Sequence, residues 1–234
     1  MPFTDDLKTT IENIAKSRWE ETEGRVVPEV VGLGNKGVKL DATFLYADLE
    51  DSTDMAMNGR QKTAEVYKAF LACCSKIIIL RGGSVRSFDG DRIMGVFIGN
   101  IKNTSAAKAA LNIKYVFNEI LLPIFKNQYE VFKNGTLKLN YSVGIDTSSV
   151  LVAQAGIRNN NDLVWVGQAP NIAAKLSTLR ESGYNSYITK AVYDSMADEA
   201  KISTDGKEMW ESRTWSKLPA NLQSIYRSSW RWQP

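Results

Sequence analysis

The sequence predicts an α+β domain built around one mixed β-sheet. Three observations support this fold class: apolar strand-like stretches alternate with long amphipathic helices, a clear hairpin signal lies between two of the helices, and the expected order is β-α-β-β-α-β. The chain has 234 residues, of which 44% are hydrophobic and 24% charged. It is therefore long enough and apolar enough to form a packed core.

The first forty residues are expected to form a helix and a connector ahead of the main domain, residues 41–234. Apolar residues recur at helical spacing in Thr4–Glu20, and Pro28–Lys39 is rich in glycine. The segment opens with acidic and polar residues, which is not the pattern of a signal peptide.

The main domain is expected to begin with a strand, a helix and a hairpin. The strand, Ala42–Leu49, is apolar and ends in acidic and hydroxyl residues, and the following helix stops at Gly82-Gly83. Within Gly83–Gly99, two strand-like stretches flank Asp89-Gly90, a strong hairpin signal.

The second half supplies the remaining elements of the sheet. A long helix is expected at Ser105–Phe125, then strands at Leu137–Ile145 and Val150–Ile157, a short strand at Leu163–Val166, and a helix at Gln168–Leu179. This order is typical of a ferredoxin-like split-βαβ sheet with extra strands and helices. Because that fold hosts many functions, it does not by itself indicate an activity.

Composition limits the chemistry that the chain can perform. It has no histidine, which excludes Ser-His-Asp or Cys-His catalysis and zinc held by histidine. The net charge is +3 with scattered basic residues, so nucleic acid is not an expected partner. The longest apolar runs are too short to span a bilayer, and the adjacent Cys73 and Cys74 favour reduced thiols. We expect a soluble, cytoplasmic protein that does not bind a membrane.

A pair of carboxylates is the first candidate for catalysis. Tyr46 and Asp48 alternate along the expected strand and share one face, and Asp91 follows the turn of the hairpin. If the hairpin pairs beside that strand, Asp48 and Asp91 converge, and two carboxylates without softer ligands select magnesium or manganese. The helix opening at Ser52 and Thr53 would offer N–H groups to a phosphate. Taken singly, such aspartates are more often helix caps or turn residues.

Four segments, spread over about residues 42–179, resemble class III nucleotidyl cyclases. YADLEDST resembles the first metal-binding strand of that family, and FDGDRIMGVF resembles its second metal-binding hairpin. VGIDTSSVLVAQAG resembles a following pair of strands, and WVGQAPNIAAKL resembles the segment that carries the transition-state residues. Each segment alone is a weak signal, but four in the family's order are a strong one.

The resemblance implies a head-to-tail homodimer whose active sites lie between the subunits. Asp48 and Asp91, with the carbonyl of Leu49, would hold two divalent cations, Mn²⁺ or Mg²⁺. Asn171 of the partner chain would orient the ribose. The resemblance also implies that residue 175 of the partner stabilises charge at the α-phosphate, and that Lys217 contacts the terminal phosphates.

Several positions depart from the family pattern. Residue 175 is lysine where the family usually has arginine, so its contact would be a point charge rather than a planar fork. Ser87 and Val164 occupy the two positions that read the base in purine cyclases, and neither side chain makes the usual polar contacts. Tyr46, on the face of Asp48, has the bulk to shorten the base pocket, although it also suits a core aromatic.

These departures make the chain similar to the bacterial pyrimidine cyclases of the Pycsar antiphage system. That resemblance implies conversion of UTP to cyclic UMP, or of CTP to cyclic CMP, as a second messenger read by a separate effector in antiviral defence. UTP is the favoured substrate. An adenylate or guanylate cyclase with unusual pocket residues and a catalytically degenerate nucleotide-binding domain stay open as alternatives, and a ferredoxin-like RNA-binding domain lacks the aromatic and basic strand pattern.

Overall fold

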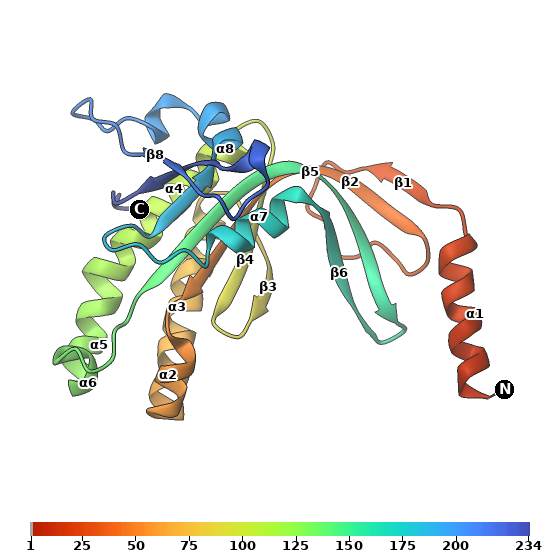
Figure 1. Ribbon diagram of the computed structural model, residues 1–234, viewed down its shortest axis with the longest axis horizontal. Helices are drawn as coiled ribbons and strands as arrows, with labels where there is room; N and C mark the ends of the chain where they lie inside the picture. Colours follow the sequence, from red (N-terminus) through yellow and green to blue (C-terminus); the bar gives the residue numbers. More distant parts are fainter. Residues whose placement is uncertain (1) are drawn as a thin grey trace.

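The computed structural model describes residues 2–234, which form one mixed sheet flanked by helices (Figure 1). In this part of the chain the sheet runs β3-β4-β2-β5-β7-β9-β8, while β1 pairs with β2 and β6 pairs with β5. The strands are β1 Glu20–Glu23, β2 Lys36–Leu49, β3 Ser84–Asp89, β4 Arg92–Ile98, β5 Tyr141–Ile157, β6 Asn160–Gly167, β7 Ser186–Thr189, β8 Glu211–Thr214 and β9 Ser224–Ser228.

The helices surround this sheet unevenly. Two long ones, α3 and α4, lie along one face beside the central strands, whereas α7 lies on the other (Figure 1). The helices are α1 Phe3–Lys16, α2 Ser52–Met57, α3 Arg60–Leu80, α4 Lys102–Val116, α5 Leu122–Gln128, α6 Glu130–Lys133, α7 Gln168–Leu176 and α8 Lys190–Ser195, with a π-helix at Phe117–Leu121 and 3₁₀ turns at Asp198–Ala200 and Ala220–Leu222.

The predicted fold class is confirmed. The elements β2, α3, β3, β4, α4 and β5 follow the order β-α-β-β-α-β, and their strands are arranged β3-β4-β2-β5 in the sheet. This arrangement is that of a split βαβ unit, in which the first strand lies between the third and the fourth. The predicted hairpin is also present, with Gly90 at φ 61° between β3 and β4.

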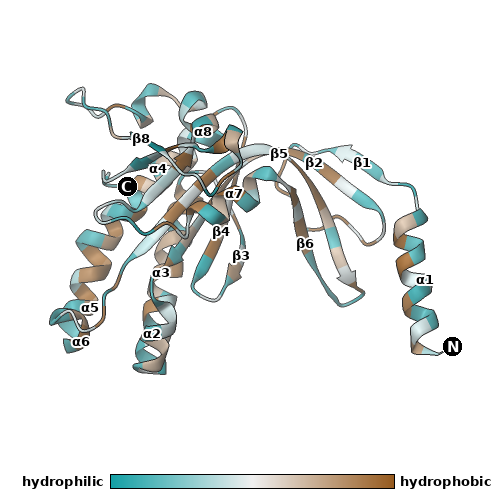
Figure 2. Ribbon diagram, in the orientation of Figure 1, coloured by the Kyte–Doolittle hydropathy of each residue, from teal (hydrophilic) through white to brown (hydrophobic). Residues whose placement is uncertain are grey.

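Each face of β2 packs against a different layer, because neighbouring side chains of a strand point to opposite faces. Leu45, Ala47 and Leu49 belong to the large core beneath α3 and α4. Phe44 belongs to a smaller core under α7, and Tyr46 packs against its edge. In Figure 2, brown apolar stretches alternate with paler, more polar ones along β2 and β5. The side of Tyr46 and Asp48 is thus the less covered side of the sheet.

Some element boundaries differ from the prediction. The two strands expected at Leu137–Ile145 and Val150–Ile157 are one continuous strand, β5, because the polar stretch between them pairs with β2 in unbroken register. The helix expected at Ser105–Phe125 is interrupted by the π-helix, which is a single-turn irregularity of α-helical stretches.

The N-terminal helix is shorter than predicted. It ends at Lys16, and Glu20–Glu23 form β1, which pairs in parallel with the start of β2. Ion pairs of Glu21 with Lys39 at 2.7 Å and of Glu20 with Lys36 at 3.8 Å accompany that pairing. The proposed domain boundary after residue 40 falls inside β2, and it stays a prediction.

Helix α1 stands apart from the body, beyond the projecting β5–β6 hairpin (Figure 1). Its apolar side chains are exposed, including Phe3, Leu7, Ile11 and Ile14. Throughout residues 2–234, none of the helices combines the length and the apolar character that a membrane span requires.

Candidate active site

The acidic pair converges at the end of β2, as the sequence predicted. Ala47 pairs with Ile93, so Asp48 lies beside Arg92 at the start of β4, and Asp91 is the residue before it. Burial raises the pKa of Asp48, the negative charge of Asp91 raises it further, and Arg180 and Arg92 oppose both effects. The two carboxylates therefore lie close enough to repel each other, and a cation between them would relieve that repulsion.

The donor set fits a hard divalent cation. Oδ2 of Asp91 is buried and lacks a hydrogen-bond partner within residues 2–234, so its lone pairs are free to bind a cation. The Leu49 carbonyl and Asp48 already share a cationic partner, the Arg180 guanidinium, at 3.3 Å from each. Over the same residues, no three His, Cys, Asp or Glu side chains gather closely enough to hold one metal ion by themselves. Two carboxylates and a carbonyl suit Mg²⁺ or Mn²⁺, which take their remaining ligands from water and phosphate.

A sharp turn leads from the acidic pair into α2. Asp51 adopts φ 55°, which is uncommon for a residue other than glycine, and the helix begins at the next residue. Ser52 is half-buried and Thr53 exposed at the first turn. The two residues predicted to bind phosphate thus lie directly after the strand that carries Asp48.

Tyr46 and Ser87 line one row across the sheet. Met94 pairs with both Tyr46 on β2 and Ser87 on β3, so the three side chains share a face. The Tyr46 hydroxyl donates to the Met94 sulfur at 2.9 Å, and the Arg92 guanidinium lies 5.8 Å from the ring centroid. Burial is the main cause that raises the pKa of Tyr46, which keeps this phenol neutral. The row forms a compact wall beside Asp48.

Helix α7 is held against the same face by contacts that the sequence did not reveal. Gly144 of β5 pairs with Tyr46, and a Cβ built at Gly144 would lie 2.1 Å from the carbonyl oxygen of Ala173. The buried Asp146 carboxylate accepts a bond from the Thr189 hydroxyl at 2.6 Å and one from the Gln168 amide at 3.3 Å. The helix therefore packs directly on the strand backbone.

Asn171 and Lys175 are both exposed on α7, one turn apart. Asn171 donates to the Gly167 carbonyl at 3.1 Å. Within residues 2–234, neither residue forms a hydrogen bond or an ion pair with Asp48 or Asp91. Lys217 is exposed too, and the adjacent Leu218 packs in one cluster with residues of α7. One chain thus presents two separate groups of predicted site residues.

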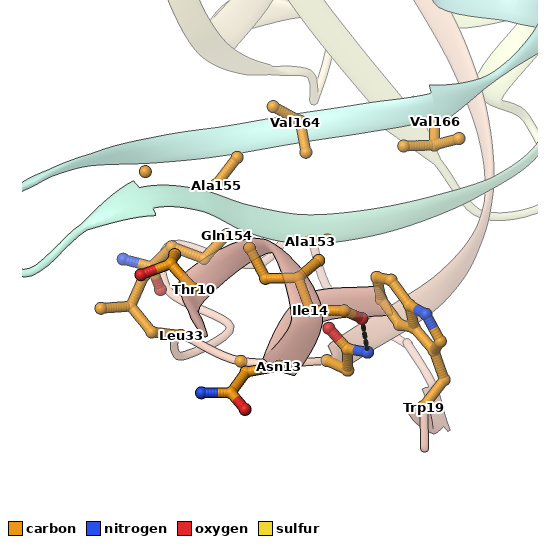
Figure 3. Close-up of a pocket in the computed structure, with 13 residues that line it drawn as sticks. Thr10, Asn13, Ile14, Trp19, Leu33, Ala153, Gln154, Ala155, Val164 and Val166 are labelled. Atoms are coloured by element: carbon orange, nitrogen blue, oxygen red, sulfur yellow. Dashed lines mark hydrogen bonds between the residues drawn. The ribbon is translucent and has the colours of Figure 1, made fainter. Parts of the chain in front are cut away.

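Val164 lies apart from the other base-reading position. It is 40% exposed on β6 and lines a cavity of about 440 Å³ between the hairpin and α1, together with Ile14, Trp19 and Leu33 (Figure 3). Its neighbour Trp165 points to the other side, where its ring packs edge-on against Phe44 with centroids 5.6 Å apart. In a single chain, Val164 is therefore not brought together with Ser87, and its role stays a prediction.

Two arginines of the site were missed by the sequence analysis. Arg92 forms an ion pair with Asp89 at 2.8 Å and stacks over Tyr46. Arg180, in the loop after α7, contacts the predicted metal ligands. The position of Arg92 directly after Asp91 was a usable signal, whereas nothing in the sequence around Arg180 pointed to β2.

Comparison with solved structures defines the class of the domain. The guanylyl cyclase Cya2 matches with a TM-score of 0.64 at 17% identity, covering 85% of this chain and 96% of that one. The adenylyl cyclase CyaB from P. aeruginosa matches with a TM-score of 0.61 at 19% identity, covering 81% and 94%. The fold is that of a class III nucleotide cyclase catalytic domain.

Comparison of sequences narrows this class. The uridylate cyclase of Xanthomonas perforans is 46% identical over all of this chain and 99% of that protein. Those of Rhodovulum sp. (strain MB263) and Burkholderia cepacia are 42% and 40% identical over 99% of this chain. No family model matches the chain. The chain belongs to the uridylate cyclase family.

Proposed function

We propose that this chain is a nucleotidyl cyclase that converts UTP to 3′,5′-cyclic UMP and pyrophosphate. The observation that carries the proposal is the 40–46% identity to three uridylate cyclases over essentially the whole chain. In the reaction, the ribose 3′-oxygen forms a bond to the α-phosphorus, the bond from that phosphorus to the β-phosphate bridging oxygen breaks, and the 3′-hydroxyl proton goes to solvent.

Asp48, Asp91 and the Leu49 carbonyl would hold two divalent cations, Mn²⁺ or Mg²⁺. Such cations promote ionisation of an attacking hydroxyl and neutralise a triphosphate. The N–H groups at Ser52 and Thr53 lie next along the chain and would bind phosphate oxygens. This use of carboxylates and metals accords with a chain that has no histidine to act as a base.

The base would lie against the row of Tyr46, Met94 and Ser87. The phenol ring takes up volume beside Asp48 that a purine's second ring would need, while a pyrimidine is smaller by that ring. Val164 would complete the pocket from a second chain. The absence of the usual polar readers at Ser87 and Val164 disfavours a purine, because a purine edge would lose hydrogen bonds there.

Asn171 and Lys175 would act on a substrate held by the partner chain. Asn171 would orient the ribose, Lys175 would stabilise the charge that develops at the α-phosphate, and Lys217 would contact the terminal phosphates. Both Asn171 and Lys175 are exposed, and neither forms a hydrogen bond or ion pair with Asp48 or Asp91 within residues 2–234, which supports a site shared across a homodimer. We also propose that the enzyme works in the cytoplasm and that a separate effector reads its product in antiviral defence.

A direct assay tests the proposal. The protein is incubated separately with UTP, CTP, ATP and GTP plus Mn²⁺, and the products are identified by mass spectrometry. Cyclic UMP should dominate. Asp48→Ala and Asp91→Ala should lose nearly all turnover while remaining folded by circular dichroism. Equal or greater turnover of another nucleoside triphosphate, including conversion of CTP to cyclic CMP, contradicts UTP as the substrate. An active Asp91→Ala variant contradicts the two-metal chemistry.

A further inference from the structure

Arg180 links the loop after α7 to the end of β2. Its Nη1 donates to the carbonyls of Ser177, at 2.7 Å, and of Leu179, at 3.1 Å, which orients the guanidinium beside its own loop. Its Nη2 lies 3.3 Å from both the Asp48 carboxylate and the Leu49 carbonyl. Nε lies 3.9 Å from the Glu50 carboxylate. Three consecutive residues of the chain therefore face one positive charge.

Two of these three partners are the oxygens that a divalent cation would use. Arginine stays charged at all relevant pH values and carries only donors, so it can satisfy a carboxylate and a carbonyl in the way a cation does. A divalent cation bound to the same groups would lie close to this positive charge and be repelled by it. The guanidinium in its observed position thus opposes metal binding at Asp48 and Leu49, and moving it away would relieve that repulsion.

The charges explain why an arginine is useful there. Asp48 is 82% buried and Asp91 lies beside it, so the site without a cation holds two carboxylates that repel each other. Arg180 offsets part of that repulsion. The Arg180 side chain is itself 26% exposed, which leaves it room to turn toward solvent.

We propose that Arg180 is a built-in counter-cation of this site, which holds Asp48 and Leu49 in the metal-free protein and is displaced when a divalent metal binds. The inference rests on the proposed function, since the cation is the one that cyclisation requires. Arg180 therefore weakens metal binding in the absence of nucleotide. Once displaced, its charge is free to pair with the triphosphate, which couples metal loading to the arrival of substrate.

Metal binding without nucleotide tests the proposal apart from turnover. Mn²⁺ is titrated into the nucleotide-free protein, and free Mn²⁺ is followed by electron paramagnetic resonance. Arg180→Gln should bind Mn²⁺ roughly five- to tenfold more tightly than the natural protein, the range expected from removing a partly buried competing charge. Arg231→Gln is the matched control, because it removes the same charge from an exposed pair with Glu119 and should leave the affinity unchanged.

Further measurements separate the possible failures. Thermal melts without metal show whether Arg180→Gln is folded, and Arg180→Lys, which keeps the charge, should retain the weaker Mn²⁺ affinity. Equal or weaker Mn²⁺ binding by a folded Arg180→Gln overturns the proposal. It would mean that the arginine positions Asp48 and the Leu49 carbonyl rather than competing with the metal. Undetectable Mn²⁺ binding in both proteins overturns it as well. The proposed function fails independently, if no cyclic UMP forms with Mn²⁺ and UTP.

Discussion

At the scale of single residues, strand geometry places Tyr46 where we expect it to influence the choice of nucleotide. The ring is placed on the face of Asp48 by strand alternation, and three neighbours fix it there: Met94 accepts its hydroxyl bond, Arg92 lies over its face and Gly144 pairs beside it. A side chain held in this way excludes volume in a defined place. We therefore expect the size of the Tyr46 ring to contribute more to specificity than its hydroxyl does.

Replacing Tyr46 by alanine should relax the preference for UTP. The space opened beside Asp48 admits a second ring, so we expect kcat/KM for ATP relative to UTP to rise about tenfold or more. Tyr46→Phe keeps the ring and loses only the bond to Met94, so it should retain the preference. The measurement is a competition between UTP and ATP in one assay. An unchanged product ratio in Tyr46→Ala would assign the choice of base to other residues.

At the scale of elements, the position of the predicted residues Asn171 and Lys175 depends on how closely α7 approaches β5. A Cβ at Gly144 would lie 2.1 Å from the Ala173 carbonyl oxygen and 2.4 Å from the Ser177 backbone nitrogen. Both are backbone atoms, so the clash cannot be relieved by turning a side chain. Any residue larger than glycine pushes away the helix that carries Asn171 and Lys175.

Gly144→Ala should therefore destabilise the protein by about 1–3 kcal/mol, the usual cost of overpacking, and should also reduce turnover. Gly37→Ala is the matched control on β2, because its Cβ would meet the Leu151 side chain, which can move. Chemical denaturation gives the free energy of unfolding of each variant. A Gly144→Ala protein as stable and active as the control would mean that α7 does not rest on this strand as closely as described.

Lys114 connects α4, on the other face of the sheet, to the loop that follows α7. It is only 6% exposed in α4, and its amine donates to the Gly183 carbonyl at 2.7 Å. Burial, and then the charge of Arg231, lower the pKa of Lys114 from 10.5 to about 8. Folding thus favours the neutral amine, so the protein gains stability as the pH rises from about 8 to about 10.5.

The gain is measurable against Lys114→Met, which has no amine to titrate. The difference in unfolding free energy between the two proteins should shift in favour of the natural one by at most about 3 kcal/mol over that window. Other groups titrate equally in both proteins and cancel. Parallel stability curves from pH 7.5 to pH 10.5 would show that the amine is as well solvated in the folded state as in the unfolded one.

The elements also show why prediction succeeded in some places and not in others. The hairpin was predictable because Asp89-Gly90 encodes a turn locally, and the pair of Asp48 and Asp91 followed from it. The polar residues Thr147–Ser149 read as a break between strands, yet pairing with β2 keeps β5 continuous. Arg180 reaches β2 from 131 positions away in the chain, and local patterns contain no such information.

At the scale of the whole molecule, the predicted machinery divides into two groups. Asp48 and Tyr46 lie on β2 and Asp91 lies just before β4, whereas Asn171 and Lys175 lie exposed on α7 and form no hydrogen bond or ion pair with the acidic pair among residues 2–234. Such a division suits two half-sites that meet across a two-fold axis, since each chain then supplies both halves.

Mixing two inactive variants tests that arrangement. In a mixed dimer of Asp48→Ala and Asn171→Ala, one site carries both substitutions and the other carries neither. With free exchange, half of the dimers are mixed and each has one intact site, so activity should recover to about one quarter of the natural level. Asp48→Ala mixed with Asp91→Ala is the matched control, because both carboxylates of a site come from one chain and every site stays damaged. Subunit exchange is verified by native mass spectrometry of differently tagged chains. If the first mixture stays as inactive as the control despite exchange, the half-sites do not meet between subunits, and Asn171 acts within its own chain or not at all.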